Sequence, residues 1–226
     1  MNIVLGSSFR NSAGRTIEVY FRRVQALQKI LSSDTTLRLA LVEGDSVDHT
    51  AEHLAIAAIN IQIPFQLIRR NHGGPVYGST EQPERMRALS YVGNGFFEAV
   101  QISDDYVVYV ESDLIWEPDV ILRLIQQISP GVIDVVSPLV FAGEAFYDIW
   151  AFRKNGVRFE PFTPYHSELN LDGLTEVDST GSCMVMHTAV ARETRMTDNA
   201  FVSFGEQARA KGYKIWVDSK ERIYHP

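Results

Sequence analysis

Apolar residues along the chain follow two alternating patterns. Short apolar runs such as YVVYV (106–110) are typical of buried strands, whereas stretches such as 17–31 carry apolar residues at helical spacing. The alternation of strand and helix patterns predicts an α/β fold, with a mostly parallel sheet and helices on both of its faces. The expected strands are 3–8, 37–44, 65–70, 106–110 and 133–140, and the expected helices are 17–31, 50–61, 83–101 and 118–128.

Local signals bear on two of these helices. Thr50 is the expected N-cap of the helix 50–61, because its hydroxyl can accept a hydrogen bond from the first turn. Gly93 and Gly95 weaken the second half of the helix 83–101, since glycine has a low helix propensity.

The pattern changes between residues 141 and 175. This stretch is aromatic, rich in proline and glycine, and only weakly periodic. It is either an ordinary surface excursion or a sugar-binding surface, which needs flat apolar rings beside polar groups. Regular patterns return as a strand at 181–187, a helix at 201–212 and a strand at 213–219, and without repeats or linkers the whole chain is expected to form one domain, 1–226.

Composition and charge exclude several classes of protein. Hydrophobic residues make up 45% of the chain, which is typical of a globular domain, and no stretch has the roughly 20 apolar residues of a membrane span. The net charge of −7 disfavours binding to nucleic acid through bulk charge. The start does not resemble a signal peptide, and the single cysteine, Cys183, fits a reducing compartment, so we expect a cytoplasmic protein with no membrane span.

Two carboxylates, Glu111 and Asp113, directly follow the apolar run 106–110. They could be an ordinary polar strand end, with Asp113 as a helix cap. However, the chain stays apolar past them, at Leu114 and Trp116, and charges in apolar surroundings usually pair or bind a metal. Carboxylate oxygens suit Mg²⁺ or Mn²⁺, so this turn is a candidate metal site.

A second acidic pair, Glu43 and Asp45, follows the expected strand 37–44. In parallel sheets, ligands bind beyond the carboxyl ends of the strands. Both acidic pairs fall at such ends, which favours a common site there. An ordinary acidic turn remains the alternative for Glu43 and Asp45.

Several segments together resemble the nucleotide-sugar-dependent glycosyltransferases of the GT-A fold. VYVESDLIWEPDVI resembles the DxD segment of that group, with Glu111 in the first acidic position. EVDSTGSCMVMHTAVAR, FVSFGEQARAKG and the final YHP resemble its C-terminal half, in the same order. YDIWAFR makes the chain most similar to the Anp1/Mnn9-like mannosyltransferases and to related capsule-type and family 2-like enzymes.

The resemblance implies a Rossmann-like three-layer α/β/α sandwich, with residues 1–115 binding the nucleotide and residues 116–226 binding the acceptor. It implies transfer of a hexosyl or N-acetylhexosaminyl group from a UDP- or GDP-sugar. The acceptor could be a saccharide, a protein or a small molecule, and neither it nor the oligomeric state follows from the sequence.

The resemblance also implies a metal site for Mn²⁺ or Mg²⁺. Asp113 would bind the cation directly, Glu111 would act directly or through water and the ribose, and His225 would supply a nitrogen ligand. A divalent cation neutralises the charge on the departing diphosphate. Mixed nitrogen and oxygen ligands favour Mn²⁺ somewhat over Mg²⁺.

Other site residues follow from the same resemblance. Of the two arginines near the start of the helix 83–101, Arg85 and Arg87, we assign Arg87 to the nucleotide or diphosphate, with a solvated position on the helix face as the alternative. The remaining expected nucleotide contacts are Ser7, Arg10, Glu43, Asp45, Glu111 and Ser112, and the expected contacts with the donor sugar or acceptor are Asp148, Trp150 and Asp178.

Glu206 is the expected catalytic residue, at a position where many inverting relatives have Glu-Asp. This chain has Gln207 in place of the aspartate, and glutamine cannot accept a proton at neutral pH. Either Glu206 is the general base, or the enzyme retains the anomeric configuration and needs none. We favour retention, because the most similar families retain.

Two other functions stay open. One is a sugar-phosphate nucleotidyltransferase, which LGSSFRNSAGR faintly resembles, although the paired glycines and lysine of that signature are missing. The other is a non-catalytic domain that binds a nucleotide or carbohydrate, because Glu111 and Gln207 both depart from the expected motifs.

Overall fold

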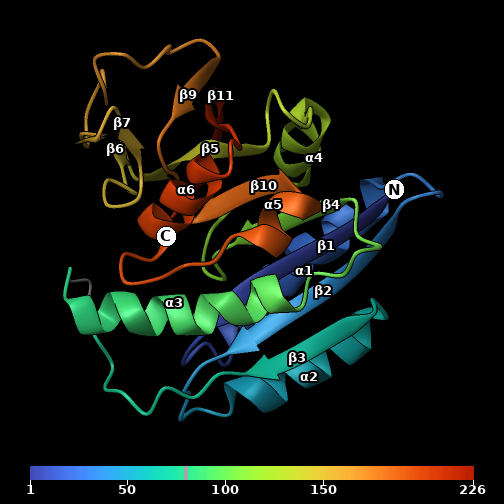
Figure 1. Cartoon of the computed structure of the whole chain (residues 1–226). Helices are drawn as coiled ribbons and strands as arrows, with labels where there is room; N and C mark the ends of the chain where they lie inside the picture. Colours follow the sequence, from blue (N-terminus) through green and yellow to red (C-terminus); the bar gives the residue numbers. More distant parts are fainter. Residues whose placement is uncertain (79–80) are drawn as a thin grey trace.

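The computed structural model describes residues 1–78 and 81–226, which form one large sheet covered by helices (Figure 1). The helices are α1 (Arg15–Ile30), α2 (Thr50–Ile61), α3 (Pro83–Glu98), α4 (Pro118–Gln127), α5 (Thr188–Glu193) and α6 (Phe201–Ala210). The strands are β1 (Asn2–Phe9), β2 (Thr36–Glu43), β3 (Phe65–Arg69), β4 (Tyr106–Val110), β5 (Val135–Ala142), β6 (Ala145–Phe146), β7 (Arg153–Lys154), β8 (Val157–Arg158), β9 (Leu174–Val177), β10 (Cys183–His187) and β11 (Ile215–Tyr224).

The sheet has the strand order β3-β2-β1-β4-β10-β5-β11-β9, with β6 paired to β5. Strands β1, β2, β3 and β4 are parallel to one another, and β5 is parallel to β11. Strand β10 is antiparallel to both β4 and β5, so these two groups of strands run in the same direction. The carboxyl ends of β1, β2, β4, β5 and β11 therefore meet at one edge of the sheet, and the α/β fold with a mostly parallel sheet is confirmed.

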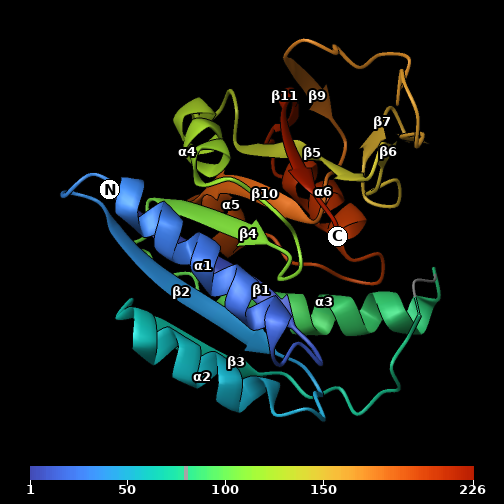
Figure 2. The same ribbon diagram turned by 180° about the vertical axis from the view of Figure 1, so that it is seen from behind.

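Alternation along the strands divides the core into two layers. Val4 and Tyr109 belong to the layer under α3, α5 and α6, which face the viewer in Figure 1. Their neighbours Leu5 and Val108 belong to the layer under α1, α2 and α4, which face the viewer in Figure 2. Successive side chains of a strand point to opposite faces, so apolar runs such as YVVYV supply both layers at once. This is the three-layer α/β/α arrangement.

Helix α3 continues through Gly93 and Gly95 and ends at Glu98, three residues before the expected end. A Cβ atom on Gly93 would lie 2.1 Å from Cε of Met196, and one on Gly95 would lie 3.1 Å from the side chain of Arg70. The glycines therefore let α3 approach its neighbours closely. This packing offsets their low helix propensity, which costs about 1 kcal/mol for each glycine.

Other element boundaries also differ from the expectations. Thr50 is the first residue of α2 and not its cap: His49 precedes it with φ 63°, and the Thr50 hydroxyl donates to Asp48. The short elements β9 and α5 were not expected, because four to six residues carry too little periodicity.

The last strand runs to Tyr224, well past residue 219. An irregularity in its pairing with β5 between Asp218 and Arg222 interrupts the alternation of side chains, which hides the second half of the strand in the sequence. The extension carries His225 to the edge of the sheet where β5 also ends. Within the described part of the chain, no helix is long and apolar enough to cross a membrane.

Candidate active site

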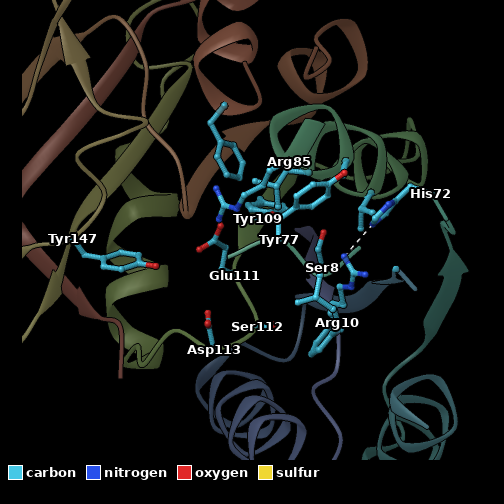
Figure 3. Close-up of a pocket in the computed structure, with 17 residues that line it drawn as sticks. Ser8, Arg10, His72, Tyr77, Arg85, Tyr109, Glu111, Ser112, Asp113 and Tyr147 are labelled. Carbon is cyan, nitrogen blue, oxygen red and sulfur yellow. Dashed lines mark hydrogen bonds between the residues drawn. The ribbon is translucent and has the colours of Figure 1, made fainter. Parts of the chain in front are cut away.

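A cavity of about 290 Å³ opens at the carboxyl edge of the sheet (Figure 3). Its walls come from the ends of β1 and β4, the loop after β3, one side of α3, and Tyr147 and Phe201 from the second half of the chain. The residues that line it are Ser8, Phe9, Arg10, Gly44, His72, Val76, Tyr77, Arg85, Ala88, Leu89, Val92, Tyr109, Glu111, Ser112, Asp113, Tyr147 and Phe201.

The acidic turn after β4 forms one wall, with Glu111, Ser112 and Asp113 all lining the cavity. The backbone N–H of Glu111 donates to the carbonyl oxygen of Ser182 at 2.8 Å, which extends the pairing of β4 with β10 into the turn. Leu114, just beyond the acids, is buried and anchors the turn to the core. The two carboxylates are thus presented on a fixed backbone.

Asp113 and His225 lie side by side at the ends of β4 and β11. Nε2 of His225 is 3.3 Å from Oδ2 of Asp113, and Nδ1 is 3.1 Å from the carbonyl oxygen of Pro226. The histidine backbone N–H donates to Phe141 at 2.7 Å, and its ring stacks on Tyr147 with the centroids 4.1 Å apart. A proton on Nδ1, donated to the carbonyl oxygen of Pro226, would leave the lone pair of Nε2 available to a cation, as in metal-binding histidines.

This pair fits two ligands of one octahedral cation. Two ligands at right angles, with bonds of about 2.1 Å, lie roughly 3 Å apart. In the part of the chain that the structure describes, no group of three or more His, Cys, Asp or Glu side chains is arranged around a common metal position. Mg²⁺-type ions are commonly held by one or two carboxylates and completed by the phosphates of a substrate, so a two-residue site matches that kind of binding.

Glu111 lies in a strongly acidic environment. Burial, followed by the charges of Asp148 and Asp113, raises the pKa of Glu111 to about 8, against a smaller lowering by Arg85. Burial also raises the pKa of Asp148 to about 6. A Cβ atom on Gly181 would lie 2.9 Å from Oδ2 of Asp148, so the glycine leaves room for this buried carboxyl behind the cavity. These raised pKa values mean that ionising the cluster is costly in the metal-free protein, and a nearby cation would lower that cost.

Two arginines line the cavity, Arg10 from the end of β1 and Arg85 from α3. Figure 3 shows the Arg85 side chain directed towards Glu111. Arg87 does not line the cavity: its guanidinium pairs with Glu84 at 3.0 Å, and its side chain is 54% exposed. The helical spacing explains the difference, because Arg85 shares one side of α3 with Ala88, Leu89 and Val92, whereas Arg87 lies on another side.

Arg10, Asp45 and His72 join the ends of β1 and β2 to the loop after β3. The backbone N–H groups of His72 and Gly73 donate to Oδ2 of Asp45 at 2.8 and 3.0 Å. Nδ1 of His72 accepts from the backbone N–H of Gly74 at 3.0 Å, and Nε2 lies 3.2 Å from Oδ2 of Asp45 and 3.3 Å from Nη1 of Arg10. Arg10 donates to the carbonyl oxygens of Gly74 and Pro75. These contacts hold the loop against the cavity.

A second pocket of about 680 Å³ adjoins the cavity and shares Arg10 and Val76 with it. Glu43 and Asp45, the two acids predicted after the second strand, both line this second pocket. Glu43 also accepts a hydrogen bond from the backbone N–H of Ser46 at 2.7 Å, which fixes the turn.

The lining of the main cavity also lacks five other predicted site residues: Ser7, Trp150, Asp178, Glu206 and His225. His225 contacts Asp113 and Tyr147, which do line it. Ser7 is fully buried and its hydroxyl donates to Val110, so the neighbouring Ser8 lines the cavity instead. Asp178 is held by Arg209 and by the backbone N–H of Gly156. Trp150 packs beneath the guanidinium groups of Arg153 and Arg158, and Glu206 is exposed on α6.

Sequence reasoning missed several lining residues, including Ser8, His72, Tyr77 and Tyr147. Tyr147 could have been noticed, because it begins the YDIWAFR segment that carries the resemblance. His72 and Tyr77 lie in a loop without periodicity, and nothing in the local sequence indicates that it turns back over the first strand.

Comparison with known proteins adds information on the fold alone. No family model matches the chain, and no curated protein matches it. Solved structures do match. A mycobacterial protein of known structure superposes with a TM-score of 0.56 at 12% identity, covering 100% of this chain and 67% of that one.

S. aureus TarS 1–349 in complex with UDP gives a TM-score of 0.56 at 13% identity, covering 99% of this chain and 60% of that chain. Its complex with UDP-GlcNAc gives a TM-score of 0.54 at 16% identity, covering 99% of this chain and 58% of that chain. This chain thus spans about three fifths of these two TarS chains, and 36% of a longer TarS chain that it also matches. The likeness extends over nearly all of the present chain, which therefore has the GT-A fold that TarS has and that the sequence resemblance predicted.

Proposed function

We propose that the chain binds a nucleotide-sugar in the cavity and is a metal-dependent glycosyltransferase. The observation that carries the proposal is that Asp113, which lies 3.3 Å from His225, lines one cavity together with Arg10 and Arg85 at the carboxyl edge of the sheet. A carboxylate and an imidazole can hold a divalent cation, and arginines bind phosphate oxygens. Together these groups are suited to a diphosphate with its metal ion. The TarS structures with UDP and UDP-GlcNAc support a nucleotide-sugar as the ligand, because they share this fold.

Each residue has a distinct role in this proposal. Asp113 and His225 hold the cation, Mn²⁺ or Mg²⁺, which when bound neutralises charge on the diphosphate. Arg85 donates hydrogen bonds to a phosphate oxygen, and Glu111, close to Arg85 and to the cavity, orients that guanidinium or a ribose hydroxyl. Arg10 fixes the loop 72–76, which closes the nucleotide side of the cavity.

The transferred group and the acceptor are the finer part of the proposal. We propose a hexosyl or N-acetylhexosaminyl group, received by an acceptor on the side of residues 116–226. Glu206 is proposed to act on the acceptor or the sugar. Glu206 is exposed and does not line the cavity, so we expect it to contact a bound acceptor or sugar and not the nucleotide. Retention of the anomeric configuration stays a prediction.

Calorimetric titration with UDP and GDP, each with and without Mn²⁺, tests the proposal. The wild-type protein should bind at least one of them with Mn²⁺-dependent affinity, and Asp113→Ala should remove the Mn²⁺ dependence. Asp172→Ala is the matched control, since Asp172 is an exposed acid outside the cavity lining. If neither nucleotide binds under any condition, the proposed function is wrong.

A nucleotidyltransferase is the second candidate. The 4-diphosphocytidyl-2C-methyl-D-erythritol synthase from Anaerococcus prevotii superposes with a TM-score of 0.50 at 10% identity, and the match covers 99% of this chain and 87% of that one. The match thus covers a larger share of this synthase than of the TarS chain in complex with UDP. Release of pyrophosphate from a nucleoside triphosphate and a sugar phosphate would favour this function, whereas release of a nucleoside diphosphate from a nucleotide-sugar favours transfer.

A further inference from the structure

Tyr147 brings the second half of the chain to the cavity. It follows β6, and its backbone N–H donates to the carbonyl oxygen of Val140 at 2.7 Å, so its position is fixed by the end of β5. Its side chain is 38% exposed and lines the cavity opposite the acidic turn. Figure 3 shows the phenol pointing into the space beside Glu111 and Asp113.

The ring of Tyr147 stacks on His225, with the centroids 4.1 Å apart and the planes 18° apart. The other contacts of His225 are a backbone hydrogen bond to Phe141, the contact of Nδ1 with Pro226 and the contact of Nε2 with Asp113. Since Pro226 is the adjacent residue, it does not fix the ring relative to the rest of the fold. The stack on Tyr147 and the contact with Asp113 are therefore the side-chain contacts that fix the imidazole relative to the rest of the fold.

The hydroxyl of Tyr147 is not needed for that stack. Among the residues that the structure describes, it has no hydrogen-bond partner, although it lies at a polar wall of the cavity. A phenylalanine would stack on His225 equally well. A phenol that points into a polar cavity without a partner is available to donate to a ligand.

We propose that Tyr147 is a catalytic residue of the transfer reaction, whose ring orients the imidazole of His225 and whose hydroxyl donates a hydrogen bond to the departing phosphate. This inference rests on the proposed function and deepens it. The bond between the anomeric carbon and the terminal phosphate oxygen breaks, and its electron pair goes to that oxygen. A bond forms between the anomeric carbon and the acceptor oxygen, which loses its proton to solvent or to a base. The proton of Tyr147 is shared with the phosphate oxygen and is not transferred.

Two substitutions separate the two roles. Tyr147→Phe keeps the ring and removes the hydroxyl, and Tyr147→Leu removes both. Tyr224→Phe is the control, since Tyr224 is an exposed tyrosine at the same edge and does not line the cavity. The measurements are Mn²⁺-dependent affinity for UDP or GDP by calorimetry, and the rate at which UDP is released from UDP-GlcNAc, or GDP from GDP-mannose.

Tyr147→Phe should bind Mn²⁺ and nucleotide like the wild type but should release the nucleotide from the sugar about 10- to 100-fold more slowly, the usual effect of losing one hydrogen bond to a charged group. Tyr147→Leu should show the same loss of rate and, in addition, weaker Mn²⁺-dependent affinity. A wild-type rate in Tyr147→Phe would overturn the role of the hydroxyl, and unchanged Mn²⁺ dependence in Tyr147→Leu would overturn the role of the ring. If the wild type itself binds neither nucleotide, the proposed function fails and the inference fails with it.

Discussion

Nε2 of His225 lies 3.3 Å from the carboxylate of Asp113, although Asp113 follows β4 and His225 follows β11. Strands β4 and β11 are separated in the sheet by β10 and β5, so neither residue reaches the other through direct strand pairing. The turn after β4 bridges this gap, because Ile115 and Tyr224 exchange backbone hydrogen bonds at 2.6 and 2.8 Å. The proposed metal site therefore depends on the pairing that places the end of β11 beside the turn after β4.

Replacing His225 by alanine should weaken Mn²⁺-dependent binding of UDP or GDP. Losing one ligand of a site with two protein ligands should reduce affinity at least about 10- to 100-fold, the range found even for groups that only support a ligand. Calorimetry measures the change, and His53→Ala is the control, since His53 is exposed on α2. Equal affinity in His225→Ala and the wild type would remove His225 from the metal site.

The two arginines near the start of α3 should differ in their effects. Arg85→Ala should weaken nucleotide binding about 10- to 100-fold, because a charge-assisted hydrogen bond to phosphate is worth about 1.5–3 kcal/mol. Arg87→Ala should leave the affinity unchanged, since Arg87 is outside the cavity and pairs with Glu84. Titration of both variants with the same nucleotide decides the assignment, and a larger effect at Arg87 would reverse it.

The metal-free protein should lose stability as the pH rises. The folded-state pKa of Glu111, about 8, is above its ordinary value of 4.5, so between these values the native state holds a proton that the unfolded chain has lost. Stability therefore falls through this window, and the contribution is lost once the pH passes about 8. Asp148, with its pKa raised to about 6, acts in the same direction.

Glu111→Gln should remove much of that pH dependence and make the metal-free protein more stable than the wild type at pH about 8.5. Each kcal/mol relieved corresponds to about 2–4 °C in Tm for a chain of this size. Calorimetric melting from pH about 5 to 8.5, in the presence of a chelator, measures the effect. Glu144→Gln is the control, because Glu144 is exposed. A parallel fall of Tm in wild type and Glu111→Gln would contradict the assignment.

Glu206→Gln tests the predicted catalytic residue without changing its shape. If Glu206 is a general base, the transfer rate should fall by about 10²–10⁴-fold, whereas a smaller fall with a raised acceptor KM indicates that it only positions hydroxyls. Affinity for the nucleotide should hardly change, because Glu206 does not line the cavity. NMR of the anomeric centre of the product then separates the mechanisms, since only inversion requires a base. A wild-type rate and KM would remove Glu206 from the reaction.

The sequence alone determined the architecture of the sheet and where the site begins. Apolar runs of strand length, separated by helical spacing, predicted the first five strands and four helices, because burial on both faces of a parallel sheet requires continuous apolar runs. The acids after YVVYV were visible because charged groups at the end of a buried strand interrupt a clear pattern, whereas the final YHP was noticed only through the resemblance. The helical spacing also contained the distinction between Arg85, which lines the cavity, and the predicted Arg87, which does not.

Only the tertiary structure decided which residues meet. Ser8 and not Ser7 faces the cavity, because the pleat of β1 turns Ser7 into the core towards Val110. His72 and Tyr147 reach the cavity through irregular segments whose course is set by long-range contacts, with Asp45 in one case and Val140 in the other. Local sequence patterns report which side of an element is apolar. They do not report which distant segment packs against it, so the contact between Tyr147 and His225 could be found only in the folded chain.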